Sequence, residues 1–246
     1  MLDELAKPKR KQKRGRTSSP ADAELPDAPK EASKTRRVVL VCSPKGGTSK
    51  TSTVRSLAVA ATQIGGLNVA TLDLDQQRTL TKWWGRRPDR VVCQFDHHEG
   101  LLSDLDDALS GLDDYDLVII DTPPSLEENP VAIRRLVGLA DLVLVPTGQY
   151  SDDLESVIPW MRLLSKYQKP CAFVLSKVKR RTNALDDARI RLNAAGAGRL
   201  CPIVIHDREE IPAAFSRGLT VLDIDRAKGA DELEGLWLFT KAELGI

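Results

Sequence analysis

The residues most able to do chemistry lie in the segment 44–52, which reads PKGGTSKTS. It follows an apolar run that ends at Ser43 and precedes a stretch with helical spacing. Backbone N–H groups of such a loop surround phosphate oxygens, and the N-terminus of the next helix also attracts negative charge. Lys50 would reach the β- and γ-phosphates, and the Thr51 hydroxyl is placed to bind magnesium. An ordinary glycine-rich turn is the alternative, but the Lys-Thr pair stands where a phosphate loop needs it.

Three carboxylates that follow predicted strands are candidates for the same site. Asp73 and Asp75 end one apolar run, and Asp121 ends another. In open α/β sheets, side chains at the carboxyl ends of the strands face the crevice where ligands bind. We expect Asp75 to position the attacking water or help hold the metal, Asp121 to accept from a magnesium-bound water, and Asp73 to lie deeper. A structural capping role is the alternative for Asp75 and Asp121.

Several motifs resemble the ParA and MinD family of deviant Walker A ATPases, especially the small plasmid-partition proteins that lack an N-terminal helix-turn-helix domain. Lys45, directly before two glycines, matches the family motif K-G-G-x-x-K-[ST]. The other matches, in chain order, are LDLDQQ at 72–77, LTKWW at 80–84, VIIDTPP at 118–124, ADLVLVP at 140–146 and DRAKGA at 225–230. The resemblance therefore covers residues 37–246 with several independent motifs.

This resemblance implies a P-loop ATPase that uses ATP and Mg²⁺ and dimerises when ATP is bound. Lys45 would be the signature lysine, which in the family crosses to the nucleotide of the partner subunit. Catalysis would consist of positioning and electrostatics with slow intrinsic turnover. The implied catalytic residues are Lys45, Lys50 and Asp75, and the implied metal-binding residues are Thr51, Asp75 and Asp121. The implied ATP-binding residues are Lys45, Gly46, Gly47, Thr48, Ser49, Lys50, Thr51, Ser52, Asp73 and Arg208.

Two positions depart from the family pattern. Ser49 stands where a glycine normally precedes the P-loop lysine, and Gln76 replaces a common proline. Glycine is usual at the first position because the backbone bends tightly against phosphate. If residue 49 needs a positive φ, serine strains the loop by about 1 kcal/mol or more. We therefore expect weaker nucleotide binding or slower turnover than in relatives with glycine.

Composition divides the chain into two parts. The 246 residues are 41% hydrophobic and 29% charged, which suits one α/β domain, expected over 36–246. Residues 1–35 contain clustered lysines and arginines followed by prolines, so we expect a disordered basic tail. The four dispersed cysteines encode neither a zinc site nor a disulfide framework, and His97, His98 and His206 make a poor metal site. No apolar run is long enough to span a membrane.

Short β-branched runs alternate with helical stretches from Arg37 onward. This alternation predicts an α/β fold of the P-loop NTPase type, with a mostly parallel sheet and helices on both faces. The expected strands are 37–43, 68–74, 116–121, 141–146, 171–176 and 200–205, with a weaker one at 91–95. The expected helices are 50–64, 101–110, 127–139, 151–167, 184–195 and 230–244. The phosphate loop then follows the first strand directly.

ParA-type proteins bind nonspecific DNA as ATP dimers, so the resemblance also implies a DNA surface on the C-terminal half. Contacts of this kind neutralise phosphates without reading bases, and binding falls steeply with salt. The candidates are Lys177, Lys179, Arg180, Arg181, Arg217, Arg226 and Lys228. A solvated charged face is the alternative for each of them, and the basic tail is a further candidate for contact with DNA or an acidic partner.

The function that this reading favours is DNA partition, in which partner-stimulated hydrolysis releases the ATP dimer from DNA. The expected partners are a second copy of the chain, nonspecific DNA and a ParB-like or other adaptor, in a cytoplasmic, nucleoid-associated setting. Positioning of a non-DNA cargo, or an accessory role in conjugative transfer, is the alternative, since a partner protein selects the cargo. A MinD-like membrane role is disfavoured because the segment 230–246 is acidic, and no membrane partner is expected.

Overall fold

A parallel sheet forms the centre of the computed structural model, which describes residues 36–91 and 93–246. The predicted basic tail at 1–35 lies outside the described residues. The strand order is β3-β2-β4-β1-β5-β6-β7, with β8 also pairing β6, and every pairing is parallel. The strands are β1 (Arg37–Val41), β2 (Val69–Asp73), β3 (Asp96–Glu99), β4 (Leu117–Asp121), β5 (Leu142–Thr147), β6 (Cys171–Val178), β7 (Arg199–Leu200) and β8 (Ile205–His206).

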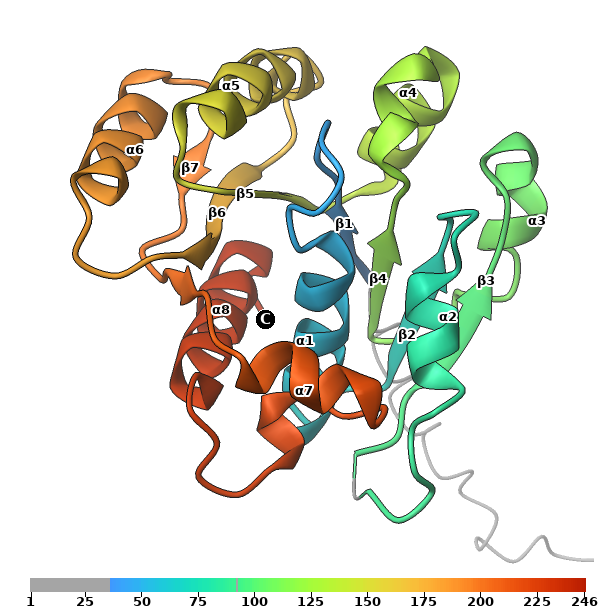
Figure 1. The fold of residues 1–246 in the computed structure, drawn as a ribbon. Coiled ribbons are helices and arrows are strands. Elements are labelled where there is room, and N and C mark those ends of the chain that lie inside the picture. Colours follow the sequence, from blue (N-terminus) through green and yellow to red (C-terminus); the bar gives the residue numbers. More distant parts are fainter. Residues whose placement is uncertain (1–35, 92) are drawn as a thin grey trace, which may run out of the picture. The chain divides into compact units, whose positions relative to one another are not determined.

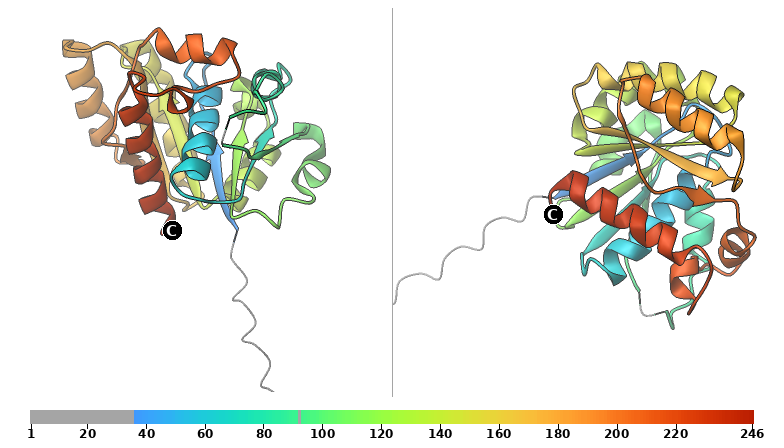
Figure 2. Two further views of the ribbon diagram at one scale, coloured as in Figure 1. Left: turned by 90° about the horizontal axis from the view of Figure 1, so that it is seen from below. Right: turned by 90° about the vertical axis from the view of Figure 1, so that its left-hand side faces the viewer.

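Helices cover both faces of this sheet (Figures 1 and 2), which confirms the predicted fold class. They are α1 (Lys50–Gln63), α2 (Thr79–Trp84), α3 (Leu105–Leu109), α4 (Pro130–Leu139), α5 (Ser151–Ser165), α6 (Asn183–Ala194), α7 (Glu210–Ser216) and α8 (Ala230–Leu244). Short 3-10 turns lie at Leu102–Asp104, Pro124–Glu128 and Val221–Asp223. No helix in the described ranges is long and apolar enough to cross a bilayer.

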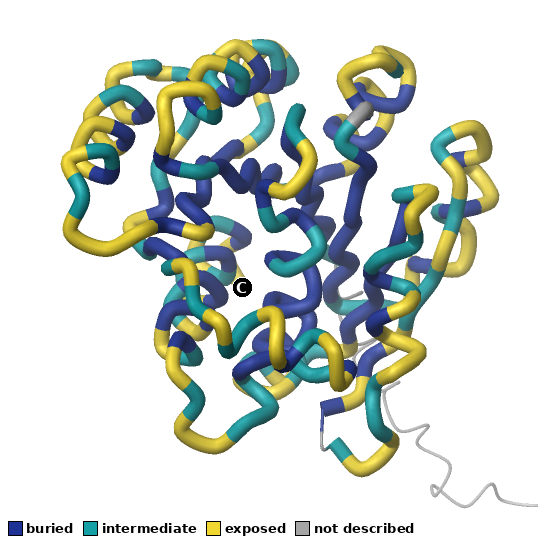
Figure 3. The backbone as a smooth tube through the Cα atoms, in the orientation of Figure 1, coloured by how far each residue is buried: buried dark blue, intermediate teal, exposed yellow. Residues whose placement is uncertain are grey.

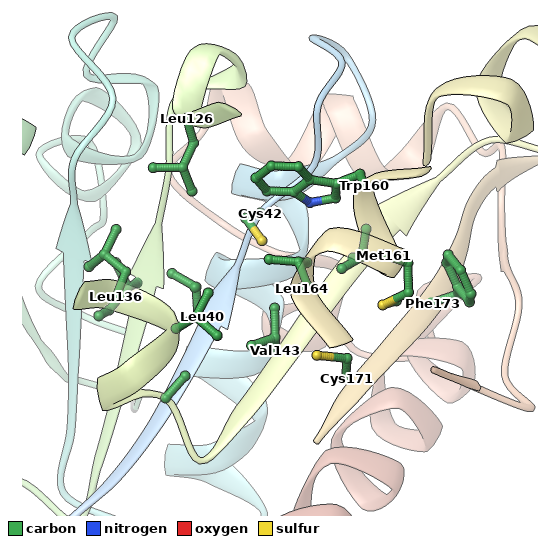
Figure 4. Packing of buried hydrophobic residues seen from close by; sticks show 14 of the residues in the cluster. Leu40, Cys42, Leu126, Leu136, Val143, Trp160, Met161, Leu164, Cys171 and Phe173 are labelled. Carbon is green, nitrogen blue, oxygen red and sulfur yellow. The ribbon is translucent and has the colours of Figure 1, made fainter. Parts of the chain in front are cut away.

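The sheet separates two hydrophobic cores, because successive side chains of a strand point to opposite faces. In β1, Leu40 faces the core under α4, α5 and α6, whereas Val39 and Val41 face the core under α1 and α8. Figure 4 shows part of the first core, where Leu136 and Trp160 from helices lie over the sheet. A strand covered on both faces has no polar side to expose, which explains the continuous apolar run RVVLV.

Helix α1 is enclosed by its neighbours. Its side chains are buried continuously from Thr53 to Ala61, which appears as a dark stretch in Figure 3. Helix α8 packs against α1, and its residues Leu233, Leu236 and Trp237 belong to the same core. The apolar side chains of the C-terminal helix are therefore part of the domain core.

The weak strand predicted at 91–95 lies instead at Asp96–Glu99, with the sequence DHHE. The apolar signal came from Cys93 and Phe95, which are buried in the α1-side core without joining the sheet. Strand β3 is the edge strand beside β2, where polar side chains are tolerated. Hydrophobicity therefore placed this strand a few residues too early.

The strand predicted at 200–205 divides into the two-residue strands β7 and β8. Pro202 lies between them and cannot donate a backbone hydrogen bond to a neighbouring strand. Similarly, the helix predicted at 127–139 begins at Pro130, after a 3-10 turn, where the Asn129 side chain accepts from the Ala132 N–H. The short helices α2 and α7 were not predicted, because six or seven residues show too little periodicity.

Candidate nucleotide-binding site

The loop between β1 and α1 has the backbone geometry of a phosphate cradle. Gly47 and Ser49 both have φ of 75°, so the chain turns twice through the left-handed region before the helix begins at Lys50. A Cβ built on Gly46 or Gly47 would meet nothing within 4 Å, so the space beside both glycines is open. The first turn of α1 contributes free N–H groups at the same place. The loop is therefore shaped to hold an anion.

Lys50 places its ammonium inside this loop. The side chain is buried, with a relative exposure of 7%, and Nζ donates to the Lys45 carbonyl oxygen at 3.0 Å. Burial lowers the pKa of Lys50, and the nearby Asp121 and Asp75 carboxylates oppose that shift. A cation held this way has one carbonyl as its direct partner and remains available to phosphate oxygens.

Thr51 and Asp121 form the part of the site that suits a magnesium ion. The Thr51 hydroxyl donates to Asp121 Oδ2 at 2.6 Å, while Asp121 Oδ1 is buried without a partner among the described residues. Burial raises the pKa of Asp121 to about 7, although Thr51 and Lys50 favour its ionised form. A hard cation here would satisfy the unpaired oxygen, and Mg²⁺ is usually held by one or two carboxylates together with substrate phosphates. The residues present therefore fit this metal.

Asp73 supports the site by bonding the segment 75–81, and none of these hydrogen bonds is to the phosphate loop. Its side chain is fully buried, and Oδ2 accepts from the Thr81 N–H and hydroxyl at 3.0 and 2.8 Å. Oδ1 accepts from the Asp75 N–H at 3.0 Å. Asp75 itself is half-buried and accepts from the Gln77 N–H. Asp73 thus fixes the loop that carries Asp75, and the ATP-binding role expected for Asp73 stays a prediction.

Lys45 lies at the start of the loop with its side chain partly exposed, and it is held within its own chain. Its Nζ donates to the Asp152 carbonyl oxygen at 2.7 Å and to Asp152 Oδ2 at 3.0 Å. Asp153 Oδ1 is 3.5 Å away. The hydrogen bond to Asp152 raises the pKa of Lys45. Both acids begin helix α5, and their role was not recognised from the sequence.

Ser49 adopts the left-handed backbone that the sequence analysis made the condition for strain. It precedes α1 with φ 75° and ψ 23°, and its side chain makes no capping hydrogen bond. A non-glycine residue pays a steric penalty in this region, and no side-chain bond offsets it. The condition for a strained loop is therefore met.

A cavity of about 480 Å³ extends from the start of α1 toward α7 and α8. Its lining includes Ser52 next to the phosphate loop and Arg208 on the opposite side. The Arg208 guanidinium donates to Glu232 Oε1 at 2.6 Å, and His206 also bonds this carboxylate. Glu232 was seen in the sequence only as a negative charge of the last helix, but it organises this wall.

The predicted DNA-binding residues do not all lie on one free surface. Lys177, on β6, lines the cavity and donates to the Gly47 carbonyl oxygen at 3.1 Å, so it contacts the phosphate loop. Arg180 lies 3.3 Å from Glu232, and Lys228 lies 3.7 Å from Glu210. The remaining exposed candidates are Lys179, Arg181, Arg217 and Arg226, of which Arg226 lies 3.6 Å from Asp225.

The histidines and cysteines have structural positions. His97 bonds Thr71 and Thr81 and stacks on Trp84, whereas His98 contacts Tyr115. All four cysteines are buried and unpaired by disulfides. No group of three or more His, Cys, Asp or Glu side chains in the described part of the chain is arranged to hold a metal.

Comparison with known proteins agrees with the nucleotide-binding site that the geometry indicates. The model of the CobQ/CobB/MinD/ParA nucleotide binding domain matches residues 39–221. The chain is 34% identical over 122 residues to the maintenance of carboxysome distribution protein A of Gloeobacter kilaueensis. That alignment covers 50% of this chain and 54% of that protein, so it spans about half the length of each.

Two solved structures show the same fold. The cell division ATPase MinD of Pyrococcus furiosus superposes with a TM-score of 0.68 at 21% identity, covering 84% of this chain and 98% of the other. McdA of Cyanothece in complex with ATP gives a TM-score of 0.65 at 18% identity, covering 86% and 97%. At these identities the similarity establishes the architecture.

Proposed function

Because this chain belongs to the CobQ/CobB/MinD/ParA nucleotide-binding family, we propose that it is a Mg²⁺-dependent ATPase that acts as a dimerising switch. The observation that carries the proposal is the Thr51–Asp121 hydrogen bond of 2.6 Å beside the open phosphate loop. It joins a hydroxyl and a carboxylate at the strand and helix ends where a nucleotide-bound Mg²⁺ is held. Lys50 supplies the cation for the phosphates on the other side of the loop.

Each residue of the site has a physical role in this proposal. Backbone N–H groups of 46–51 bind phosphate oxygens, and Lys50 neutralises the charge that develops during transfer. Thr51 and Asp121 hold the metal, which supplies electrostatic stabilisation when bound. Asp75, fixed by its bond to Asp73, orients the attacking water. No covalent intermediate is required, so the protein contributes position and charge.

Lys45 is the residue that we propose couples ATP to dimerisation. It stands outside the cradle, with its side chain 35% exposed, where a second chain can bring its own nucleotide. To reach that nucleotide, the ammonium must leave Asp152 and Asp153. The triphosphate of a partner is a stronger attraction than these two carboxylates, because it carries more charge in a drier environment.

The ATP dimer would bind DNA through the exposed lysines and arginines of the C-terminal half. Lys179, Arg181, Arg217 and Arg226 are exposed and can contact phosphates without reading sequence. An adaptor of the ParB kind would then stimulate hydrolysis and release the dimer. We propose that residues 1–35 form a region apart from the domain at 36–246. The basic residues of this tail would add a second contact with DNA.

A non-DNA cargo is the second candidate. It is favoured by the 34% identity to a protein named for the maintenance of carboxysome distribution. In this version the chain would still cycle between a monomer and an ATP dimer, and a different adaptor would link it to a protein assembly. The two candidates share the site and differ in the cargo.

Three variants test the proposal. Wild-type protein should become dimeric with Mg-ATP in size-exclusion chromatography with light scattering, and remain monomeric with Mg-ADP. Lys45→Ala should bind ATP without dimerising, and Lys50→Ala should lose binding. Lys166→Ala, an exposed lysine on another face, is the matched control. Dimers that form equally with ADP, or in the Lys50 variant, would contradict the switch.

The cargo candidates are separated by DNA binding. If DNA is the matrix or cargo, ATP-dependent binding to random DNA should weaken as salt rises. Removal of residues 1–35 should reduce the affinity at low salt if the tail makes the second contact. A dimer that hydrolyses ATP but ignores DNA at low salt would exclude the DNA-binding role.

A further inference from the structure

The cavity beside α1 contains an unusual share of unsatisfied polar atoms. Eight buried side-chain polar atoms in the described part of the chain have no hydrogen-bond partner. Three of them, Arg55 Nε, Ser176 Oγ and Arg208 Nε, belong to residues that line this one cavity. Buried polar groups are normally paired, and clustering of the exceptions indicates that a polar ligand completes them.

Arg55 is the most informative of the three. Its relative exposure is 4%, and no hydrogen bond or ion pair joins its guanidinium to any described residue. Its neighbours are aromatic rings: the guanidinium carbon lies 4.4 Å from the Phe215 ring centroid and 6.0 Å from that of Trp83. The rings hold the side chain in place but provide no anion.

A second buried arginine shows what is missing. Arg87 is also almost fully buried, and its guanidinium forms two hydrogen bonds with Asp223, at 2.7 and 3.0 Å. Among the described residues, the fold therefore places a carboxylate in hydrogen-bond contact with one buried arginine and leaves the other without such a contact. A buried cation without a bonded counter-ion is costly. Burial, together with Arg86, lowers the pKa of Arg55 to about 10, although the Asp121 carboxylate opposes this shift.

The surroundings of Arg55 suit a small oxyanion. The planar guanidinium presents parallel donors that match a carboxylate or a phosphate. Ser56 follows it on α1 and lines the same cavity. Phe215 lies against the Arg55 guanidinium and adds apolar surface to the cavity lining, which strengthens an ionic contact by excluding water.

We propose that the end of the cavity lined by Arg55, Ser56 and Phe215 is an anion subsite for the carboxylate or phosphate of a small molecule. It adjoins the nucleotide site within the same cavity, since Arg55 lies about one helical turn beyond Thr51 on α1. The subsite rests on the proposed function only in that nucleotide phosphates occupy the loop end. Because α1 carries both positions, an anion bound at Arg55 affects the nucleotide site through the same helix.

The test uses full-length protein saturated with Mg-ADP, so that added anions cannot reach the phosphate loop. Inorganic phosphate and malonate are titrated separately, and the melting temperature is measured. We expect one of them to raise it by about 3–5 °C at tenfold excess over its Kd. Arg55→Met should lose the rise, whereas Arg86→Met, which removes the exposed cation over the same ring, should keep it. No rise with either anion, or a rise that survives Arg55→Met, would overturn the proposal.

A second measurement needs no variant. Phenylglyoxal labels accessible guanidinium groups, and mass spectrometry reports the labelled fraction of Arg55 in the wild-type chain. The effective anion should reduce labelling of Arg55 at least threefold in the Mg-ADP complex and leave Arg86 unchanged. Equal labelling with and without anion would count against the subsite even if Arg55→Met failed to fold. Failure of Mg-ADP to bind would instead count against the proposed function.

Discussion

The ammonium of Lys45 lies 3.0 Å from the carboxylate of Asp152 and 2.7 Å from its carbonyl oxygen. A residue proposed to act on a partner's nucleotide is thus tied to the first turn of α5 in the single chain. Formation of the dimer must exchange one set of negative charges for another. If Lys45 acts as proposed, the strength of this internal contact sets how much ATP is needed to form a dimer.

Replacing Asp152 and Asp153 by Asn should make dimerisation easier. The change removes two carboxylates that hold Lys45 and leaves the helix backbone intact. Exposed ion pairs are weak, so we expect the ATP concentration for half-maximal dimer to fall about two- to fivefold. Light scattering at increasing ATP measures it, with Glu155→Gln on the same helix as the control. An unchanged midpoint would show that the contact does not restrain Lys45.

Replacing Ser49 by Gly should improve nucleotide use. Glycine adopts a φ of 75° without a Cβ clash, whereas serine is strained there. We expect Mg-ATP to bind about fivefold more tightly, or to turn over faster by a similar factor. Ser49→Ala keeps the Cβ and removes only the hydroxyl, so it should behave as wild type. If Ser49→Gly leaves both ATP affinity and turnover unchanged, backbone strain does not limit the site.

His97 should make the nucleotide-free protein less stable in mild acid. Burial lowers its pKa to about 4, with smaller effects from Asp73, His98 and Arg78. The unfolded chain takes up a proton near pH 6.5 that the folded chain refuses until about pH 4. The free energy of unfolding therefore falls as the pH falls from 6.5 to 4, by about 2–3 kcal/mol from this group.

Urea unfolding of His97→Asn over that pH range measures this contribution. The variant should show a shallower decline than wild type, although its stability at pH 7.5 will be lower because two hydrogen bonds to threonines are lost. His98→Asn controls for the neighbouring ring. Parallel curves for wild type and His97→Asn would refute the prediction.

Lys177 and Arg226 should affect different ligands, although both were predicted from the sequence to bind DNA. Lys177 touches the phosphate loop at the Gly47 carbonyl oxygen, whereas the Arg226 side chain is 92% exposed. Lys177→Met should weaken Mg-ATP binding. Arg226→Ala should leave it unchanged but reduce the salt dependence of DNA binding by about one phosphate contact. The reverse pattern would mean that the loop contact is incidental.

The sequence was most informative where chemistry requires particular residues at fixed spacing. Lys50 and Thr51 could be placed because a phosphate loop tolerates few other residues there. Ser49 has the positive φ on which the expected strain depends, because the same loop fixes the backbone. The parallel sheet followed from continuous apolar strands such as RVVLV, which are typical of strands buried on both faces.

Contacts between distant segments could not be predicted. Arg55 looked like an ordinary helix residue, and only the tertiary structure shows that it is buried beside Phe215 without a counter-ion. Asp152 and Lys45 are far apart in the chain, and no periodicity connects them. Glu232 likewise binds His206 and Arg208 through the approach of α8 to β8. For Arg55, the one available signal was that a basic residue stands within an otherwise buried helix.

The position of β1 in the sheet has a consequence for synthesis of the protein. In the described part of the chain, its partners are β4 and β5, which end at Asp121 and Thr147. During translation β1 and the phosphate loop emerge long before β4 and β5. The apolar strand β1 remains unpaired until those strands have emerged. Closing such long loops is slow, and unpaired apolar strands are targets for aggregation and for chaperones. We therefore expect nucleotide to assist folding mainly after β4 and β5 have paired with β1.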